Sequence, residues 1–270
     1  MKKKVAKKVS PVASPQKAAA KKSPAAKKGS GKTSAGLIVR DAQTIGTESV
    51  ASSWQRLEKW LAVHHPKLFK ALRPPATAKQ IETAEKAIGQ RLPDSVRESY
   101  LIHDGHKRGG GSGLLFGLPL LPLADIVKVW RQQTEIYKDS QKPKRLAEAA
   151  EWVSCFPPES IRPCYFHPGW IPISEDAGGN FLALDLNPDS QGFTGQVIAY
   201  GRDEHCRPVF ARSFGQFLSD IADELEAGNF LLAADPDDDE YLIFRLAMPK
   251  QKHFHSAGKE WAKAKLGIKR

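Results

Sequence analysis

The sequence lacks the features that mark secreted, disulfide-stabilised or membrane-spanning proteins. Its 270 residues include only three cysteines, an odd number that is too small for a disulfide framework. No apolar stretch near the start has the form of a secretory signal, and the lysine-only first region departs from the arginine-rich pattern of transit peptides. The longest apolar run, residues 114–124, is broken by Pro119 and Pro122 and is too short to cross a bilayer. We therefore expect a soluble, reduced, cytoplasmic protein with no membrane span.

Acidic residues are missing from positions 1–36, which contain eleven lysines. The net charge of the whole chain is also +11, so residues 37–270 are neutral overall. The repeated Lys-Lys, Ala-Ala and Ser-Pro steps cannot bury enough apolar surface to offset the entropy of ordering. The composition therefore predicts a disordered Lys/Ala/Pro-rich tail over 1–36, followed by a Ser/Thr/Gly-rich linker over 37–52.

The tail is similar to that of a linker histone, which makes its lysines candidates for contacting nucleic-acid phosphates without reading base sequence. The alternative is that the tail only solubilises the protein, because like charges repel and solvate. The nucleic-acid-binding candidates are Lys2, Lys3, Lys4, Lys7, Lys8, Lys21, Lys22, Lys27 and Lys28.

The remaining pattern predicts an α+β domain over 53–232, with a mostly antiparallel sheet and helices packed against it. Apolar spacing predicts helices at 54–63, 77–104 (interrupted at Gly89), 123–138 and 213–227, and a short helix around 146–152. Short apolar runs between turn residues predict strands at Leu114, Trp170, Phe181, Val197 and Pro208. Residues 233–270 are expected to form an acidic loop over 234–240, one packed apolar element over 241–246, and a basic C-terminal extension with a loose helix.

Metal ligation is one chemistry that the side chains suggest. Cys164 and His167 are separated by two residues, but no second pair at zinc-finger spacing accompanies them. His205 and Cys206 are adjacent, which makes chelation by both awkward. We therefore expect that these cysteines and Cys155 are free, and that the chain binds neither a metal nor another cofactor.

Acid–base catalysis is the other chemistry to consider. Glu175, Asp176 and Asp185 resemble the carboxylates of a hydrolase, but nothing in the sequence places two of them in a common cleft. We therefore predict no catalytic residues. Asp185 lies in an otherwise apolar strand, and we expect it at the strand end, where its carboxyl can bond to the next loop.

The stretch from Trp170 to Glu226 carries a specific order of segments. WIPI is followed by an acidic-Gly-Gly-Asn turn, then LALDL, a Gly-rich loop ending in GQVI, and a helix that begins SFGQFL. Upstream lie a tryptophan-containing helix, RLPDSVRESYLIHDG and GLLFG. Together these segments resemble the fungal cell-wall assembly regulator family and its bacterial relatives, the SUKH superfamily of immunity proteins, over roughly residues 54–230.

The resemblance implies a SUKH-like fold and a non-enzymatic protein-binding module. Its partner would be either a toxin that an immunity protein neutralises or a cell-wall regulatory protein. The lysine tail, which the shared core does not require, argues against simple toxin masking. A nucleic-acid-associated protein anchored by its tail is the alternative function, and an enzyme ranks third.

Loops on a rigid sheet are common recognition sites, which points to the turn after WIPI. The protein-binding candidates are Trp170, Asp176, Gly178, Gly179 and Asn180. The alternative is a turn that serves only to connect two strands.

Overall fold

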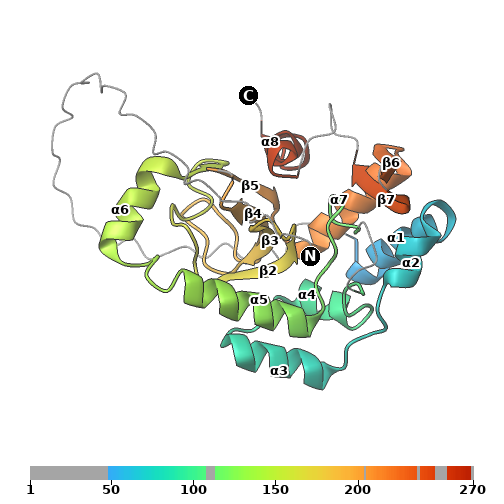
Figure 1. Ribbon diagram of the computed structural model, residues 1–270, viewed down its shortest axis with the longest axis horizontal. Helices are drawn as coiled ribbons and strands as arrows, with labels where there is room; N and C mark the ends of the chain where they lie inside the picture. The colour runs from blue at the N-terminus through green and yellow to red at the C-terminus, as the bar shows by residue number, and fades with distance from the viewer. Residues whose placement is uncertain (1–47, 108–112, 204, 236–237, 247–253, 269–270) are drawn as a thin grey trace, which may run out of the picture. The chain divides into compact units, whose positions relative to one another are not determined.

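A computed structural model of the chain describes residues 48–107, 113–203, 205–235, 238–246 and 254–268. The tail lysines predicted to bind nucleic acid lie outside these ranges. The helices are α1 (Val50–His64), α2 (Pro66–Ala71), α3 (Ala78–Ile88), α4 (Asp94–Tyr100), α5 (Leu123–Ile136), α6 (Pro143–Trp152), α7 (Phe214–Glu226) and α8 (Phe254–Lys265) (Figure 1). The strands are β1 (Ser154–Phe156), β2 (Trp170–Glu175), β3 (Asn180–Asp185), β4 (Gln196–Gly201), β5 (Cys206–Ala211), β6 (Phe230–Asp235) and β7 (Asp238–Leu246).

The central sheet has five strands in the order β1-β5-β4-β3-β2. Strands β2 to β5 form an antiparallel meander, and β1 pairs in parallel with β5. Every residue of β3 is buried, which explains why its sequence shows no alternation of apolar and polar side chains. The predicted α+β fold with a mostly antiparallel sheet is confirmed.

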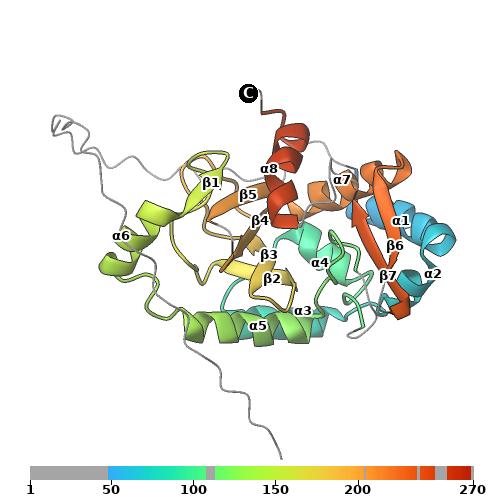
Figure 2. The same cartoon turned by 45° about the horizontal axis from the view of Figure 1, so that its top comes forward.

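Helices cover the sheet from both sides. Helix α5 packs against β2, and α3 packs against α5. Helix α8 packs against β5, and Figure 2 shows α5 and α8 on opposite sides of the sheet. Helix α7 contacts β4 and β5 and also packs against α1, so it joins the sheet to the first helices of the chain.

Local sequence explains where several helices begin and end. Helix α3 begins after Thr77, whose hydroxyl and backbone form a capping box with Gln80, and it ends at Gly89, which has a φ of +77°. In α1 the predicted apolar stripe is buried, and Trp54 donates from Nε1 to the hydroxyl of Ser99 in α4 at 2.9 Å. Both tryptophans of α1 are buried and belong to the core.

The strand predicted at Leu114 is wrong. Residues 113–118 instead form a tight turn with two isolated bridges, and Phe116 adopts a φ of +57°. Leu114 and Leu115 are fully buried, so this apolar run fills the core without joining the sheet. A short buried run has the same composition whether or not it pairs with a strand, so periodicity could not separate the two cases.

Further elements differ from the predictions. Helix α2 and the short strand β1 were not predicted, and α1 begins at Val50, inside the segment predicted as a linker. The acidic loop expected over 234–240 is incorrect, because Ala234 and Asp235 end β6 and Asp238 begins β7. Residues 236 and 237 lie outside the described ranges. Residues 241–246 belong to strand β7, which pairs with β6, and the C-terminal helix is confirmed as α8.

Candidate functional site

The turn predicted to bind a partner connects β2 to β3. The Oδ1 atom of Asp176 accepts hydrogen bonds from the backbone N–H groups of Gly178 at 2.7 Å and Asn180 at 3.0 Å. Gly179 has a φ of +98°, a conformation that favours glycine. Asp176 and Gly179 are half-buried, and Gly178 is exposed. These three residues form an ordered turn, and their contact with a partner stays a prediction.

Two of the protein-binding candidates are buried and cannot make direct contacts in this conformation. Trp170 has no exposed surface, because it lies inside the core at the start of β2. Asn180 is 3% exposed and joins two loops: its Nδ2 donates to Asp176 Oδ2 at 2.7 Å and to Asp203 Oδ2 at 2.9 Å. Neither residue was recognisable as buried from its position in the sequence, because both lie beside turn residues.

The three carboxylates considered for catalysis do not come together. The register of the β2–β3 hairpin pairs Glu175 with Phe181 at one end and Trp170 with Asp185 at the other. At about 3.4 Å per residue, the strand separates the two ends by roughly 17 Å. Paired glycosidase carboxylates lie about 5 to 9.5 Å apart, so Asp176 and Asp185 do not form such a pair.

Asp185 has the structural role predicted for it. It is the last residue of β3, and its carboxylate accepts from the N–H of Asn187 and from Gln196 Nε2, both at 2.9 Å. Its backbone carbonyl accepts from the N–H of Gly195 at 2.7 Å. Complete burial raises the pKa of this carboxyl to about 7. Asp185 therefore fixes both ends of the loop between β3 and β4.

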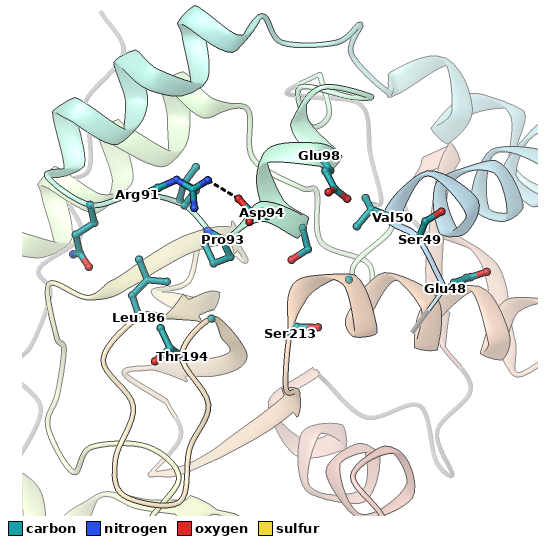
Figure 3. A pocket seen from close by; sticks show the side chains of 15 residues that line it. Glu48, Ser49, Val50, Arg91, Pro93, Asp94, Glu98, Leu186, Thr194 and Ser213 are labelled. Atoms are coloured by element: carbon teal, nitrogen blue, oxygen red, sulfur yellow. Dashed lines mark hydrogen bonds and ion pairs between the residues drawn. The ribbon is translucent and has the colours of Figure 1, made fainter. Parts of the chain in front are cut away.

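That loop forms one wall of an open groove of about 690 Å³ (Figure 3). The other walls come from the start of α1, the connection between α3 and α4 with the start of α4, and the start of α7. The lining residues are Glu48, Ser49, Val50, Gln90, Arg91, Leu92, Pro93, Asp94, Ser95, Glu98, Leu186, Thr194, Gly195, Ser213 and Gly215. Because these segments are distant in sequence, no local pattern predicted the groove.

The groove has an apolar floor and a polar rim. Val50 and Leu92 are buried in the floor, and Gly195 has a φ of +85° with no side chain to fill the space beside Pro93. On the rim, Arg91 donates to Asp94 at 2.6 Å (Figure 3). Glu98 is exposed and has no ion-pair partner within the described ranges. The rim therefore carries an acidic group that is available to a ligand.

The predicted free thiols are found at Cys155, Cys164 and Cys206. Burial raises the pKa of the Cys164 thiol to about 11, so it stays protonated at neutral pH. Both ring nitrogens of His167 have local partners: Nδ1 accepts from the N–H of Gly169 at 2.8 Å, and Nε2 lies 2.8 Å from the side-chain amide of Asn187. Over the part of the chain that is described, no group of three or more His, Cys, Asp or Glu residues could hold a metal ion. In the same part, no helix is long and apolar enough to cross a membrane.

Comparison with known proteins identifies relatives of this chain. The chain is 37% identical over 208 residues to "Cell wall biosynthesis/cell cycle regulator smi1" of Schizosaccharomyces pombe, which covers 75% of this chain and 41% of that protein. It is 31% identical to "Glucan synthesis regulatory protein" of Neurospora crassa, over 76% of this chain and 44% of that protein. It is also 31% identical to "Cell wall assembly regulator SMI1" of Saccharomyces cerevisiae, over 74% of this chain and 46% of that protein. The chain thus spans less than half the length of each of these relatives.

The family model of the SMI1/KNR4 family (SUKH-1) matches residues 75–220. This range begins just before α3 and ends within α7, so it includes the four-strand meander and three of the four walls of the groove. The match confirms the resemblance drawn from the order WIPI, LALDL, GQVI and SFGQFL. The chain belongs to the SMI1/KNR4 (SUKH-1) family.

Proposed function

We propose that this chain is a non-enzymatic regulator of cell-wall biosynthesis that acts by binding another protein. Its relatives are named as regulators of cell-wall assembly and glucan synthesis, which supports the regulatory role. The single observation that carries the binding role is the groove bounded by α1, α4, α7 and the β3–β4 loop.

The construction of the groove favours a protein segment as its occupant. Protein interfaces combine an apolar centre with a polar rim, and the groove repeats this arrangement with Val50 and Leu92 below and Glu98 and Arg91 above. Its volume of about 690 Å³ lies within the range of protein pockets that bind ligands.

The charges on the rim indicate what the segment carries. Asp94 pairs with Arg91 and so offsets its positive charge. Glu98 is exposed, while Glu48 keeps its charge through hydrogen bonds from Ser52 and Ser53 and an ion pair with Arg56. Because the net charge of the rim is negative, we propose that the segment brings a lysine or arginine toward Glu98.

A double substitution in the groove tests this proposal. In Glu98→Lys/Thr194→Arg, the acidic group is reversed and a long side chain enters the groove from the β3–β4 loop. Glu82→Lys/Thr83→Arg, an equal charge change at two exposed positions on α3 outside the groove, is the matched control. Partners captured from nuclease-treated fungal extract are cross-linked and quantified by mass spectrometry, and each variant is expressed in cells that lack their own family member.

We expect the groove variant to lose about tenfold or more of a specific protein partner, and also to lose cell-wall function. The control should keep both. Equal capture and equal cell-wall growth by both variants would refute the groove as the binding surface. If the wild-type chain captures a partner from untreated extract but not from nuclease-treated extract, the result would instead favour the nucleic-acid alternative.

A further inference from the structure

A second pocket, of about 500 Å³, lies between the α5–α6 connection and the β4–β5 hairpin. It is lined by Ile136, Tyr137, Lys138, Asp139, Ser140, Arg145, Val153, Tyr165, Gly201, Arg202, His205 and Arg207. Four of these residues are permanently cationic at neutral pH and one is acidic. We call this the basic pocket.

Arg207 places a positive charge inside the protein at this pocket. Its side chain is 1% exposed, and its guanidinium donates to the backbone carbonyls of Cys164 and Tyr165. The guanidinium also lies over the ring of Trp170, 5.1 Å from the centroid. No carboxylate of the described residues lies within ion-pair distance, and Nε has no hydrogen-bond partner among them.

A buried cation without a carboxylate is unusual, because desolvation makes an unpaired charge unfavourable. Burial lowers the pKa of Arg207 to about 10, which still leaves the group charged at neutral pH. Within the described ranges, its hydrogen bonds go to neutral carbonyls, and its guanidinium lies over an aromatic ring. An anion in the pocket would provide the missing countercharge.

The other cations of the pocket are free to turn toward a ligand. Lys138 and Arg145 form ion pairs with Glu135 and Glu148, three residues away on the same segment, and both cationic side chains are more than half exposed. Arg202 lies 3.4 Å from Asp203 and is 70% exposed. Exposed pairs of this kind contribute only about 0 to 1 kcal/mol, so exchanging them for a doubly charged ligand costs little.

The β2–β3 turn takes part in this pocket through Arg202. A Cβ atom added at Gly179 would lie 2.7 Å from Arg202 Cδ, so the glycine backbone packs directly on the stem of that side chain. Asn180 fixes the same two loops to each other by bonding both Asp176 and Asp203. Gly179 therefore acts as a positioning residue for Arg202.

Exposed apolar side chains lie at the border of the basic pocket. Ile136 lines it and is 59% exposed. Trp152 is 63% exposed and directly precedes Val153, another lining residue. A free phosphate ion would gain nothing from these two side chains, whereas a peptide would, since tryptophan is a frequent anchor of protein interfaces.

We infer that the basic pocket binds a phosphorylated serine or threonine side chain of a partner protein, with an apolar neighbour of that residue packing on Ile136 and Trp152. Arginine clusters are a recurrent means of recognising phosphorylated segments, because the guanidinium fork matches the phosphate oxygens. The inference rests on the proposed function in one respect: the ligand belongs to a protein partner. The basic pocket is a different surface from the groove. The groove lies at the β3–β4 loop, whereas the basic pocket lies at the other end of β4, beside Gly201 and Arg202.

The test uses the full chain and two probes: inorganic phosphate, and a peptide library with a central phosphoserine. The same library with unmodified serine is the reference. The variants are Arg145→Gln/Arg202→Gln, at two exposed positions where folding is not at risk, and Trp152→Ala. Lys128→Gln/Arg131→Gln, an equal charge change at two exposed positions on α5 that line neither pocket, is the matched control. Arg207→Met is measured as well, with circular dichroism to establish that it folds.

We expect the phosphorylated library to bind at least about tenfold more tightly than the unmodified one. The Arg145→Gln/Arg202→Gln variant should lose this difference. Trp152→Ala should weaken binding of the peptide without changing the affinity for inorganic phosphate, and Lys128→Gln/Arg131→Gln should change neither affinity. Equal binding of the two libraries would overturn the inference, and so would inorganic phosphate binding that the peptide does not improve, which would indicate a small free anion. If the groove variant Glu98→Lys/Thr194→Arg loses partner capture but still binds the phosphopeptide, both proposals are supported. If the groove variant keeps partner capture while Arg145→Gln/Arg202→Gln loses phosphopeptide binding, the groove is refuted and the basic pocket is supported.

Discussion

The C-terminal helix offers the sharpest test of how the fold is held together. In α8, Trp261 is 1% exposed and donates from Nε1 to the backbone carbonyl of Phe210 in β5 at 2.9 Å. Its ring contacts Phe116, Phe210 and Phe217, with centroid distances of 4.9 to 6.4 Å. This one side chain therefore joins α8 to the sheet, to α7 and to the turn at 113–118.

The cost of truncating Trp261 to alanine follows from this environment. A buried tryptophan removes about 150 to 250 Å² from water, which at about 25 cal/mol per Å² corresponds to roughly 4 to 6 kcal/mol. Measured tryptophan-to-alanine changes in protein cores cost about 3 to 5 kcal/mol, because the surroundings relax only in part. We expect the free energy of unfolding of Trp261→Ala to fall by about 3 to 5 kcal/mol, a large share of the usual total of about 5 to 15 kcal/mol.

Urea denaturation followed by far-ultraviolet circular dichroism measures this loss, and the chain contains its own control. Trp152, at the end of α6, is 63% exposed, so Trp152→Ala is the same chemical change without the burial. We expect that control to change the free energy of unfolding by no more than about 0.5 kcal/mol. Similar losses in the two variants, or a loss below about 1 kcal/mol in Trp261→Ala, would refute the argument that α8 is part of the core.

The remaining predictions concern the sheet ends. The pKa of Asp185 is about 7 in the folded state and near 4 in the unfolded state, so the folded state binds the proton more tightly. The stability that protonation of Asp185 contributes is therefore complete below about pH 4 and is lost as the pH rises through about 7. Between pH 5 and pH 8, the wild type should lose about 2 to 3 kcal/mol relative to Asp185→Asn, and parallel pH profiles of the two proteins would contradict this. Ala177, at a φ of +57°, should tolerate glycine with a gain of about 0.5 to 1 kcal/mol in the free energy of unfolding; a loss in denaturation would disprove the strain at this position. Asn180→Ala should cost about 2 kcal/mol, since the Oδ2 atoms of Asp176 and Asp203 both lose the hydrogen bond from Asn180 Nδ2, and an unchanged melting curve would contradict a stabilising role for these two bonds.

Local signals account for the parts of the fold that were predicted correctly. The capping box at Thr77 and the stop at Gly89 lie within one or two helical turns of the residues that they affect. The same holds for the turns between β2, β3, β4 and β5, whose glycines and asparagines end each apolar run. The strand-end position of Asp185 was predictable because an acid in an apolar strand requires nearby donors.

The errors have a physical cause of their own. Leu114 to Phe116 is as apolar as a strand, and only its pairing partners could show that it forms a turn. Strand β1 has three residues and pairs with β5, about fifty residues later, so it leaves almost no local pattern. Trp170 stood beside a turn and was taken for a surface residue, whereas the sheet encloses it completely.

The sequence by itself determined the α+β class, the positions of strands β2 to β5, the family, and the role of Asp185, because each depends on neighbours along the chain or on the order of segments. The order of the strands in the sheet was decided by the structure. Only the tertiary structure decided the two candidate binding surfaces. The groove joins four segments from α1 to α7, and the basic pocket joins cations from residues 138 to 207 around one buried arginine. Arg207 lies between Cys206 and Pro208, and nothing in this local sequence distinguishes it from an exposed arginine. Only folding buries it away from the carboxylates of the described residues.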